Sequence, residues 1–194
     1  FPYTTLFRSY KQALDHIIFT DYLDFHLYEY GEFIDSVRVA EIKGNNIVGI
    51  DGAEEKFAGM IEHLATSAIQ SITSASKLAK LMAAKARLLA NIIDTAMNDE
   101  AETYENDNLQ GQYTAFKDVL IQELTKSEFA DIYAQTIVYG MFAARLHDET
   151  PEDFSREEAA KLIPKTNPFL RQIFNNLAGN DLDERIAWVV DDLV

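Results

Sequence analysis

The first part of the chain alternates apolar and polar residues in the way that is typical of β-strands. The β region covers residues 16–43: an aromatic, strand-like run comes first, Gly31-Glu32 can supply a turn, and alternation follows from Phe33 to Ile42. The apolar positions of this region include Phe25, Leu27, Tyr28, Val37 and Val39. The pattern predicts a β-hairpin. Because two strands are marginally stable alone, we expect the hairpin to complete a sheet or to pack on helices. The next stretch, residues 43–52, is rich in turn-forming residues.

From Ala53 onward, the spacing of apolar residues becomes helical. The first predicted helix has its apolar face at Phe57, Met60, Ile61, Leu64, Ala68 and Ile72. A second helix follows, with Ser74 or Ser76 as its N-cap. The acidic, polar residues 98–108 are predicted to form a linker, and a third helix is expected over about residues 109–124.

The C-terminal part of the chain carries clear signals for helix starts. Thr125 and Glu128 form a capping-box pattern, in which each residue satisfies a backbone N–H of the other. The helix that they open runs to Leu146 and is apolar almost all round, as expected at the centre of a bundle. Later helices are predicted after the caps Ser155, Asn167 with Pro168, and Asp181 or Asp183. The predicted fold is mainly α, a helical bundle with a short N-terminal β-hairpin.

Composition narrows the classes of protein to which the chain can belong. Its 194 residues are 47% hydrophobic and 25% charged, which is a globular balance. The lack of cysteine excludes disulfides, thiolate metal sites and a cysteine nucleophile. No apolar run approaches the ~18–20 residues of a membrane span, and no secretory segment opens the chain. We therefore expect a cytoplasmic protein with no membrane partner.

The formal net charge is −15, so the segment as a whole would be repelled by phosphate groups. If a larger parent protein binds DNA, most of the attraction must come from its other parts.

Two groups of residues contain side chains that can bind metal ions. The four histidines, His16, His26, His63 and His147, show no i,i+4 pair and no HExxH motif, so they are interpreted as surface or half-buried residues. Glu41-Ile42-Lys43 is an E-x-K pattern preceded by Asp24 and Asp35. Metal-dependent nucleases place an Asp and an E-x-K on adjacent strands to hold a divalent cation. The pattern is short and common by chance, and we assign no metal ligand from it.

Three further features have structural as well as functional interpretations. Residues 166–169, TNPF, contain half of the N-P-P-Y/F loop of amino-methylating enzymes, but Asn167-Pro168 is explained by a helix start. Lys85 falls within the apolar stripe of its helix, where it must snorkel or find an acidic partner. Lys77, Lys80 and Arg87 form a basic flank that either contacts phosphate or is a solvated face.

Both ends of the chain are expected to be cuts. Residues 1–9, FPYTTLFRS, are similar to the in-frame translation of a sequencing-adapter oligonucleotide, and nothing in their pattern predicts an organised element. The alternative is a genuine N-terminal extension. Residues 183–194 are apolar-periodic and end without a Gly, Asn or Pro stop signal. In a fragment, we expect the apolar face of this last helix to be exposed, at Ile186, Val189, Val190 and Leu193.

Three stretches of the chain resemble one family. They are FTDYLDFHLYEYGE (Phe19–Glu32), FADIYAQTIVYGMFAARL (Phe129–Leu146) and IPKTNPFLRQIFNNLAGNDLDERIAWVVDDLV (Ile163–Val194). Their wording, order and spacing are similar to the segment that precedes the catalytic core of large adenine-specific DNA methyltransferases, found in bacterial single-polypeptide restriction–modification systems. The resemblance extends over nearly all of residues 10–194.

This resemblance implies a domain organisation. Residues 1–9 are the adapter-like remnant, residues 10–52 the tail of an upstream nuclease-like domain, and residues 53–194 a helical spacer leading into a methyltransferase domain. The S-adenosylmethionine loop and the N-P-P-Y/F motif of the family are expected beyond Val194. No catalytic, cofactor-binding or metal-binding residue is therefore assigned in this chain. S-adenosylmethionine is the expected cofactor of the parent protein, and its expected partners are DNA and the adjacent domains in cis.

The leading hypothesis is thus a helical connector that positions a methyltransferase module on DNA and couples it to a nuclease module. Two alternatives remain open. One is a remnant of a nuclease domain that uses Glu41 and Lys43, and the other is a stand-alone helical module that binds a protein partner.

Overall fold

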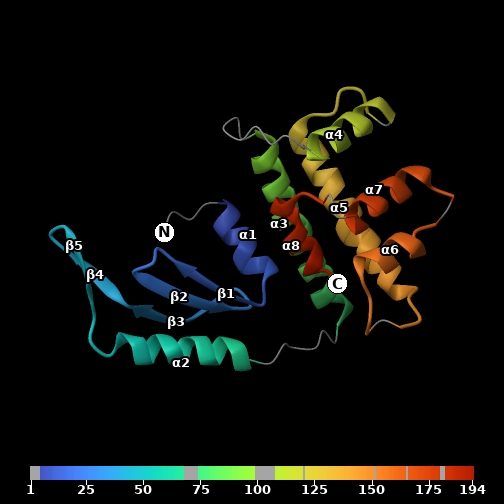
Figure 1. The fold of residues 1–194 in the computed structure, drawn as a ribbon. Coiled ribbons are helices and arrows are strands. Elements are labelled where there is room, and N and C mark those ends of the chain that lie inside the picture. Colours follow the sequence, from blue (N-terminus) through green and yellow to red (C-terminus); the bar gives the residue numbers. More distant parts are fainter. Residues whose placement is uncertain are drawn as a thin grey trace. The chain divides into compact units, whose positions relative to one another are not determined.

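The computed structural model describes the protein over residues 5–67, 74–98, 108–119, 121–150, 152–164, 166–179 and 182–194. Within these ranges the chain forms eight helices and five short strands, all of the strands near the N-terminus (Figure 1). The predicted fold class, mainly α with a short N-terminal β region, is confirmed. The chain divides into two compact units, Phe1–Leu81 and Met82–Val194.

The first unit is built on a three-stranded antiparallel sheet with the strand order β1-β2-β3. Its strands are β1 (His16–Thr20), β2 (Asp24–Glu29) and β3 (Glu32–Arg38). The predicted hairpin of β2 and β3 therefore completes a larger sheet, as expected, because β1 adds a strand on the other side of β2. The β1–β2 turn is held by Asp21, whose Oδ1 accepts hydrogen bonds from the backbone N–H groups of Leu23 and Asp24 at 3.0 and 2.8 Å. These hydrogen bonds lower the pKa of Asp21.

A two-residue loop joins β2 to β3. Its residues, Tyr30 and Gly31, both have positive φ, at 49° and 85°. Two consecutive positive φ values define the hairpin turn whose twist matches that of the flanking strands. A β-bulge follows, because the register changes between the pairs Leu27↔Asp35 and Tyr28↔Phe33. The turn was predicted one residue later, at Gly31-Glu32.

The turn-rich stretch after β3 contains a second, two-stranded sheet. Strand β4 (Ala40–Lys43) pairs antiparallel with β5 (Asn46–Gly49). Ile42 lies directly opposite Ile47, and Ala40 lies opposite Gly49. Strand β5 was missed in the sequence because its four residues are flanked on both sides by turn-forming residues. The two strands β4 and β5 form a β-ribbon, residues 40–49, called the ribbon below. In Figure 1 it extends away from the three-stranded sheet.

Helix α2 (Ala53–Thr66) packs against the three-stranded sheet and completes its core. Leu27, Val37 and Met60 are buried together, and the rings of Phe25 and Phe57 lie 4.6 Å apart between centroids. The predicted domain boundary between residues 52 and 53 therefore separates two elements that share a core, and it falls inside the first unit. Strand β2 and helix α2 approach each other through residues distant in sequence, which local periodicity does not reveal.

Helix α1 (Thr5–Ala13) begins within the stretch that was expected to form no organised element. That prediction was wrong for residues 5–9. The ring of Phe7 lies 4.2 Å from that of Phe19 and 6.1 Å from that of Tyr28, and Ala13 is buried. Phe7, Tyr10 and Ala13 recur at helical spacing. This pattern was not used to predict a helix, because residues 1–9 were excluded for their similarity to a translated adapter.

The second unit is a bundle of helices. Helix α3 (Ala75–Asn98) crosses the boundary between the units, and its residues from Met82 onward belong to the bundle. The other helices are α4 (Asn108–Val119), α5 (Lys126–Leu146), α6 (Arg156–Leu162), α7 (Pro168–Ala178) and α8 (Glu184–Asp191). The third predicted helix, 109–124, ends earlier than expected, at Val119. Ala68, Ile72 and Asp181, together with nearly all of the 98–108 linker, lie outside the described residues.

Helix α5 lies among the other helices of this bundle, as predicted (Figure 1), but it is not buried all round, because Tyr139 is 48% exposed. Phe129 and Tyr133 stack on one another with centroids 5.1 Å apart, and Phe116 of α4 meets both rings edge-on. Burial raises the pKa of the Tyr133 phenol, and the charge of Asp183 adds to this shift. Two turns further along the same face of α5, Gly140 lies against the buried ring of Phe174 in α7.

Local capping signals were predicted correctly. The Thr125 hydroxyl accepts from the Glu128 N–H at 3.2 Å, and the Glu128 carboxylate accepts from the Thr125 N–H at 2.9 Å. Hydrogen bonds from Thr125 lower the pKa of Glu128. Ser74 and Ser155 accept backbone hydrogen bonds at the starts of α3 and α6.

The apolar face of α8 is buried within the second unit. Ile186, Val189 and Val190 are almost completely inaccessible to solvent, and Leu193 is partly buried against the same core. The expectation that this face is exposed was therefore wrong. The residues that cover it come from the rest of the bundle, and their proximity could not be deduced from the helix itself.

Asp183 caps α8 and gives a pH-dependent prediction. Burial acts to raise the pKa of Asp183, but hydrogen bonds from the Arg185 side chain and backbone N–H outweigh it, so the pKa is lowered. Because the pKa is lower in the folded state, the ionised carboxylate stabilises the fold at pH values above the unfolded pKa near 3.9. This stabilisation is lost as the pH falls through the folded pKa. We expect Asp183→Asn, which keeps the cap but not the charge, to be less stable than wild type at pH 7. Urea unfolding should show this difference disappearing in strong acid, and a constant difference would contradict the pairing with Arg185.

Candidate functional site

The E-x-K residues lie on the exposed ribbon and pair with each other. The Lys43 ammonium is 2.6 Å from Oε1 of Glu41. Strand β4 belongs to a different sheet from the strands that carry Asp24 and Asp35. The structure therefore does not bring a carboxylate from an adjacent strand of the same sheet beside this pattern. No three histidine or acidic side chains within the described ranges are placed to hold a metal ion together.

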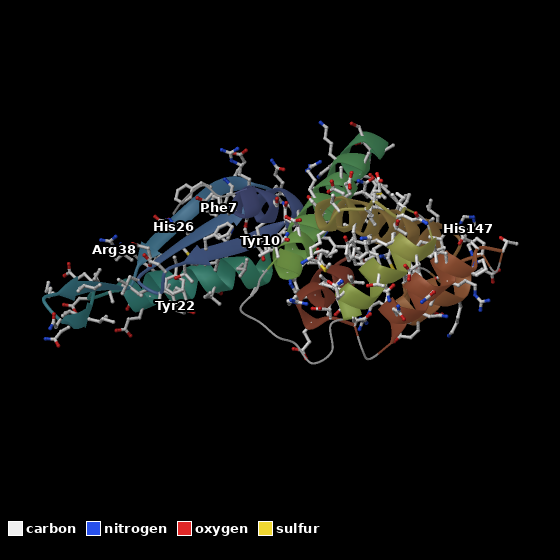
Figure 2. All side chains as sticks on the ribbon, turned by 90° about the horizontal axis from the view of Figure 1, so that it is seen from above. Phe7, Tyr10, Tyr22, His26, Arg38 and His147 are labelled. Atoms are coloured by element: carbon white, nitrogen blue, oxygen red, sulfur yellow. The ribbon has the colours of Figure 1, made fainter. Side chains whose placement is uncertain are left out.

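Asp24 instead forms a two-pronged ion pair with Arg38 across β2 and β3. The Arg38 Nε donates to Oδ1 at 2.8 Å and Nη2 donates to Oδ2 at 2.6 Å. These hydrogen bonds lower the pKa of Asp24 and raise that of Arg38. Figure 2 shows Arg38 and His26 on this sheet, and the register places both on the face that carries Phe19. Oδ1 of Asp35 accepts a hydrogen bond from the Ser36 N–H at 2.7 Å.

Two of the histidines converge on one carboxylate, which the sequence did not indicate. Nε2 of His63 lies 2.8 Å from Oε1 of Glu29, and the Ser67 hydroxyl donates to the same oxygen at 3.1 Å. Nε2 of His16 lies 3.7 Å from that oxygen and is buried, with no hydrogen-bond partner among the described residues. Ser67 is not bonded to either imidazole, so this group lacks the nucleophile–base contact of a catalytic triad. Glu29 ties the ends of β1, β2 and α2 together.

A cavity of about 350 Å³ opens where the ribbon leaves the sheet and α2 begins. Its lining residues are Phe25, Val39, Gly49, Ile50, Asp51, Glu54 and Phe57. Four of the lining side chains are apolar, two of them aromatic, and the two carboxylates are exposed. Neither Asp51 nor Glu54 forms an ion pair or a side-chain hydrogen bond with any described residue. This combination of apolar walls and unpaired acids makes the cavity the best candidate for binding in the first unit.

The residues of the predicted basic flank have different surroundings. The Lys77 ammonium lies 5.7 Å from the centre of the Tyr30 ring, within the first unit. In the second unit, Arg87 lines a smaller cavity of about 190 Å³. Its other lining residues are Ala83, Ala86, Asp131, Gln135 and Tyr139.

Asn167 and Pro168 start α7, as predicted. Oδ1 of Asn167 accepts from the Leu170 N–H at 3.0 Å, and Pro168 occupies the first turn. The last histidine, His147, lies at the end of α5 in the second unit (Figure 2), with its Nδ1 2.7 Å from the Ala143 carbonyl oxygen. Both features are accounted for by helix capping.

Lys85 has the acidic partner that its position in an apolar stripe demanded. Its ammonium pairs with Oδ2 of Asp192, just beyond the end of α8. The Lys85 side chain is only 13% exposed, whereas that of Asp192 is 41% exposed. The pair therefore joins a nearly buried cation to an anion that water still reaches.

Two more basic side chains reach the end of α8. The Arg156 Nε lies 3.0 Å from Oδ1 of Asp191, and Arg145 donates to the carbonyl oxygen of Val194. Cations are favourable at a helix C-terminus because unpaired carbonyl groups give that end a partial negative charge. Side chains from α5 and α6 thus join Lys85 of α3 in fixing α8.

Removing the charge of Asp192 should lower the stability of the second unit more than removing the charge of Lys85. We expect Asp192→Asn to destabilise the second unit by about 1–2 kcal/mol, because it leaves the ammonium with a neutral partner. Lys85→Met keeps an apolar stem of similar length and should cost less. Urea unfolding followed by the emission of Trp188 measures both. A larger cost for Lys85→Met than for Asp192→Asn would contradict this account.

No family model, curated protein or solved structure matches the chain. Among the described helices, none combines the length and the apolar character needed to cross a membrane. The function is therefore inferred from the residues of the chain and from the resemblance of its three stretches to a family.

Proposed function

We propose that the chain is a connector region of an adenine-specific DNA methyltransferase from a single-polypeptide restriction–modification system. One observation carries the proposal: each of the three stretches that resemble the family contributes buried residues to the core of one of the two units. Phe19–Glu32 contains β2, the central strand of the sheet. Phe129–Leu146 lies within α5, and Ile163–Val194 contains α7 and α8, which supply buried residues to the same core as α5. A likeness in core-forming residues is the kind that a shared fold requires.

The bundle has the physical properties that a connector needs. Helix α5 has 21 residues, so it is about 30 Å long at 1.5 Å per residue. Its buried side chains contact the surrounding helices, and this single core keeps the helix ends in fixed positions relative to one another. In the proposed role, the bundle sets the position of the methyltransferase domain, and the first unit belongs to the nuclease-like part. S-adenosylmethionine and DNA are then ligands of the parent protein, which acts in the bacterial cytoplasm.

The flanking DNA sequence tests this proposal directly. We expect the reading frame to continue beyond Val194 into an S-adenosylmethionine loop and an N-P-P-Y/F motif. A continuous frame that lacks both motifs would overturn the proposal.

A stand-alone interaction module is a second candidate, and the buried apolar face of α8 favours it. Because Ile186, Val189 and Val190 are covered within the second unit, the bundle does not need a missing domain to cover them. Soluble, monodisperse behaviour of the 194-residue chain is consequently compatible with both candidates. Only the connector requires the methyltransferase motifs in the same reading frame, so the flanking sequence also separates these two functions.

A further inference from the structure

The cavity between the ribbon and α2 has the chemistry of a site for an organic cation. Phe25 and Phe57 form two of its walls, with ring planes inclined by 55°. Aromatic faces attract ammonium and guanidinium groups. Asp51 and Glu54 add two carboxylates that have no partner among the described residues. An anionic ligand would be repelled by the same carboxylates, and a neutral one would leave them unpaired.

The surface beside the cavity is aliphatic. The register places Ile42, Ile47, Ala40 and Gly49 on one face of the ribbon, since residues directly opposite each other share a face. Ile42 is 65% exposed and Ile47 is 72% exposed. Gly49 belongs to this face and also lines the cavity, so the aliphatic face leads into the cationic site.

The ribbon also offers main-chain hydrogen bonds. Within the described residues, β4 and β5 pair only with each other, so each has an unpaired edge. An extended segment that adds to such an edge gains backbone hydrogen bonds, and its alternate side chains point to one face. This favours a protein segment over a free amine.

We propose that the cavity and the adjacent ribbon bind an extended segment of a protein partner that carries a lysine or arginine side chain. The basic side chain enters the cavity along the exposed faces of the two phenylalanine rings, which contact each other, and pairs with Asp51 and Glu54. An aliphatic side chain two positions away, about 7 Å along the strand, covers Ile42 and Ile47. The inference rests on the first unit alone and does not depend on the proposed connector function.

The test uses a synthetic peptide, acetyl-leucyl-threonyl-lysyl-threonyl-leucine amide, titrated into the full 194-residue chain labelled with ¹⁵N. We expect saturable amide shifts at Gly49 and Phe57. Replacing the lysine of the peptide by norleucine should weaken binding at least about fivefold, the effect of one exposed ion pair near 1 kcal/mol. Butylammonium alone should bind more weakly than the peptide.

Matched variants assign the interaction to the proposed side chains. Asp51→Asn combined with Glu54→Gln should weaken binding of the lysine peptide about fivefold or more, but not that of the norleucine peptide. Glu55→Gln removes a carboxylate from the same helical turn outside the cavity lining and should change affinity less than about twofold. Ile47→Ser should weaken binding of the peptide but not of butylammonium.

Four results would overturn the proposal. The first three are equal binding of the lysine and norleucine peptides, shifts that map away from the cavity, and the absence of saturable shifts up to about 5 mM peptide. Butylammonium binding as tight as that of the peptide would assign the cavity to small amines and overturn the protein partner.

Discussion

Gly140→Ala should destabilise the second unit by about 1–3 kcal/mol, although alanine is the better helix former. A Cβ at this position would lie 2.3 Å from Cζ and 2.7 Å from Cε2 of Phe174. Both distances are well inside van der Waals contact, and the Phe174 ring is completely buried. The ring must therefore shift within a packed core, and this cost exceeds the gain of up to about 1 kcal/mol in helix propensity. Urea unfolding monitored by Trp188 emission measures the change.

Gly111→Ala is the matched control. Gly111 is also helical and in the same unit, but a Cβ there meets nothing within 4 Å. Alanine should stabilise the unit by about 0.4–1 kcal/mol, because it restricts the unfolded chain. The two substitutions are chemically identical and are expected to have opposite signs. In addition, Phe174→Leu should relieve part of the cost of Gly140→Ala when the two are combined, and strictly additive effects would show that the two residues do not clash.

Leu27→Ala should unfold the first unit selectively. Leu27 is 1% exposed and belongs to a small buried cluster with Val37 and Met60. Truncating such a leucine costs about 2–5 kcal/mol, a large fraction of the stability of a small unit. The chain has one tryptophan, Trp188, and it lies in α8 of the second unit. We expect an early unfolding transition in far-ultraviolet circular dichroism that is not seen in the emission of Trp188.

Ile47→Ala is the matched control for Leu27→Ala, because isoleucine and leucine have the same number of carbon atoms. Ile47 lies on the ribbon and is mostly exposed. Little burial is lost, so its cost should stay below about 1 kcal/mol. If Leu27→Ala shifts the circular dichroism and the Trp188 transitions together, the two cores unfold cooperatively. The two compact units are then not independent in stability.

Features that depend on neighbouring residues in the sequence were the ones that could be predicted. The capping box of Thr125 and Glu128 and the start of α7 at Asn167 each depend on residues within one helical turn. The place of α5 among the other helices of the bundle followed from its own apolar pattern. Periodicity reports which faces of an element are apolar, and it therefore predicted the helices well.

What could not be predicted depends on contacts between distant residues. The pairing of β1 with β2, the packing of α2 on the sheet and the cover over α8 all join elements that carry no local signal of one another. The boundary between the two compact units likewise falls within α3, where the helical period continues and gives no local signal.

The candidate site was only partly visible in the sequence. The position of Lys85 in an apolar stripe showed that it needs an acid, but Asp192 lies 107 positions away and could not be identified. The cavity combines Phe25, Val39 and residues of the 49–57 stretch, which are three separate segments of the sequence. The convergence of His16 and His63 on Glu29 likewise required the tertiary fold. The E-x-K pattern, in contrast, was visible and proved to be a local ion pair.

The two-residue loop at Tyr30 and Gly31 restricts insertions at this point as strongly as a buried side chain restricts substitutions. Gly31 has a positive φ, and a Cβ there would lie 3.2 Å from the carbonyl oxygen of Lys11, so both conformation and space favour glycine. A loop this short also fixes which residues of β3 face α2. One inserted residue would turn the strand over, moving Val37 out of the core and its charged neighbour Arg38 into it. A one-residue insertion here would therefore exchange the buried and exposed side chains of the whole of β3. The same insertion in a longer loop would change only the loop.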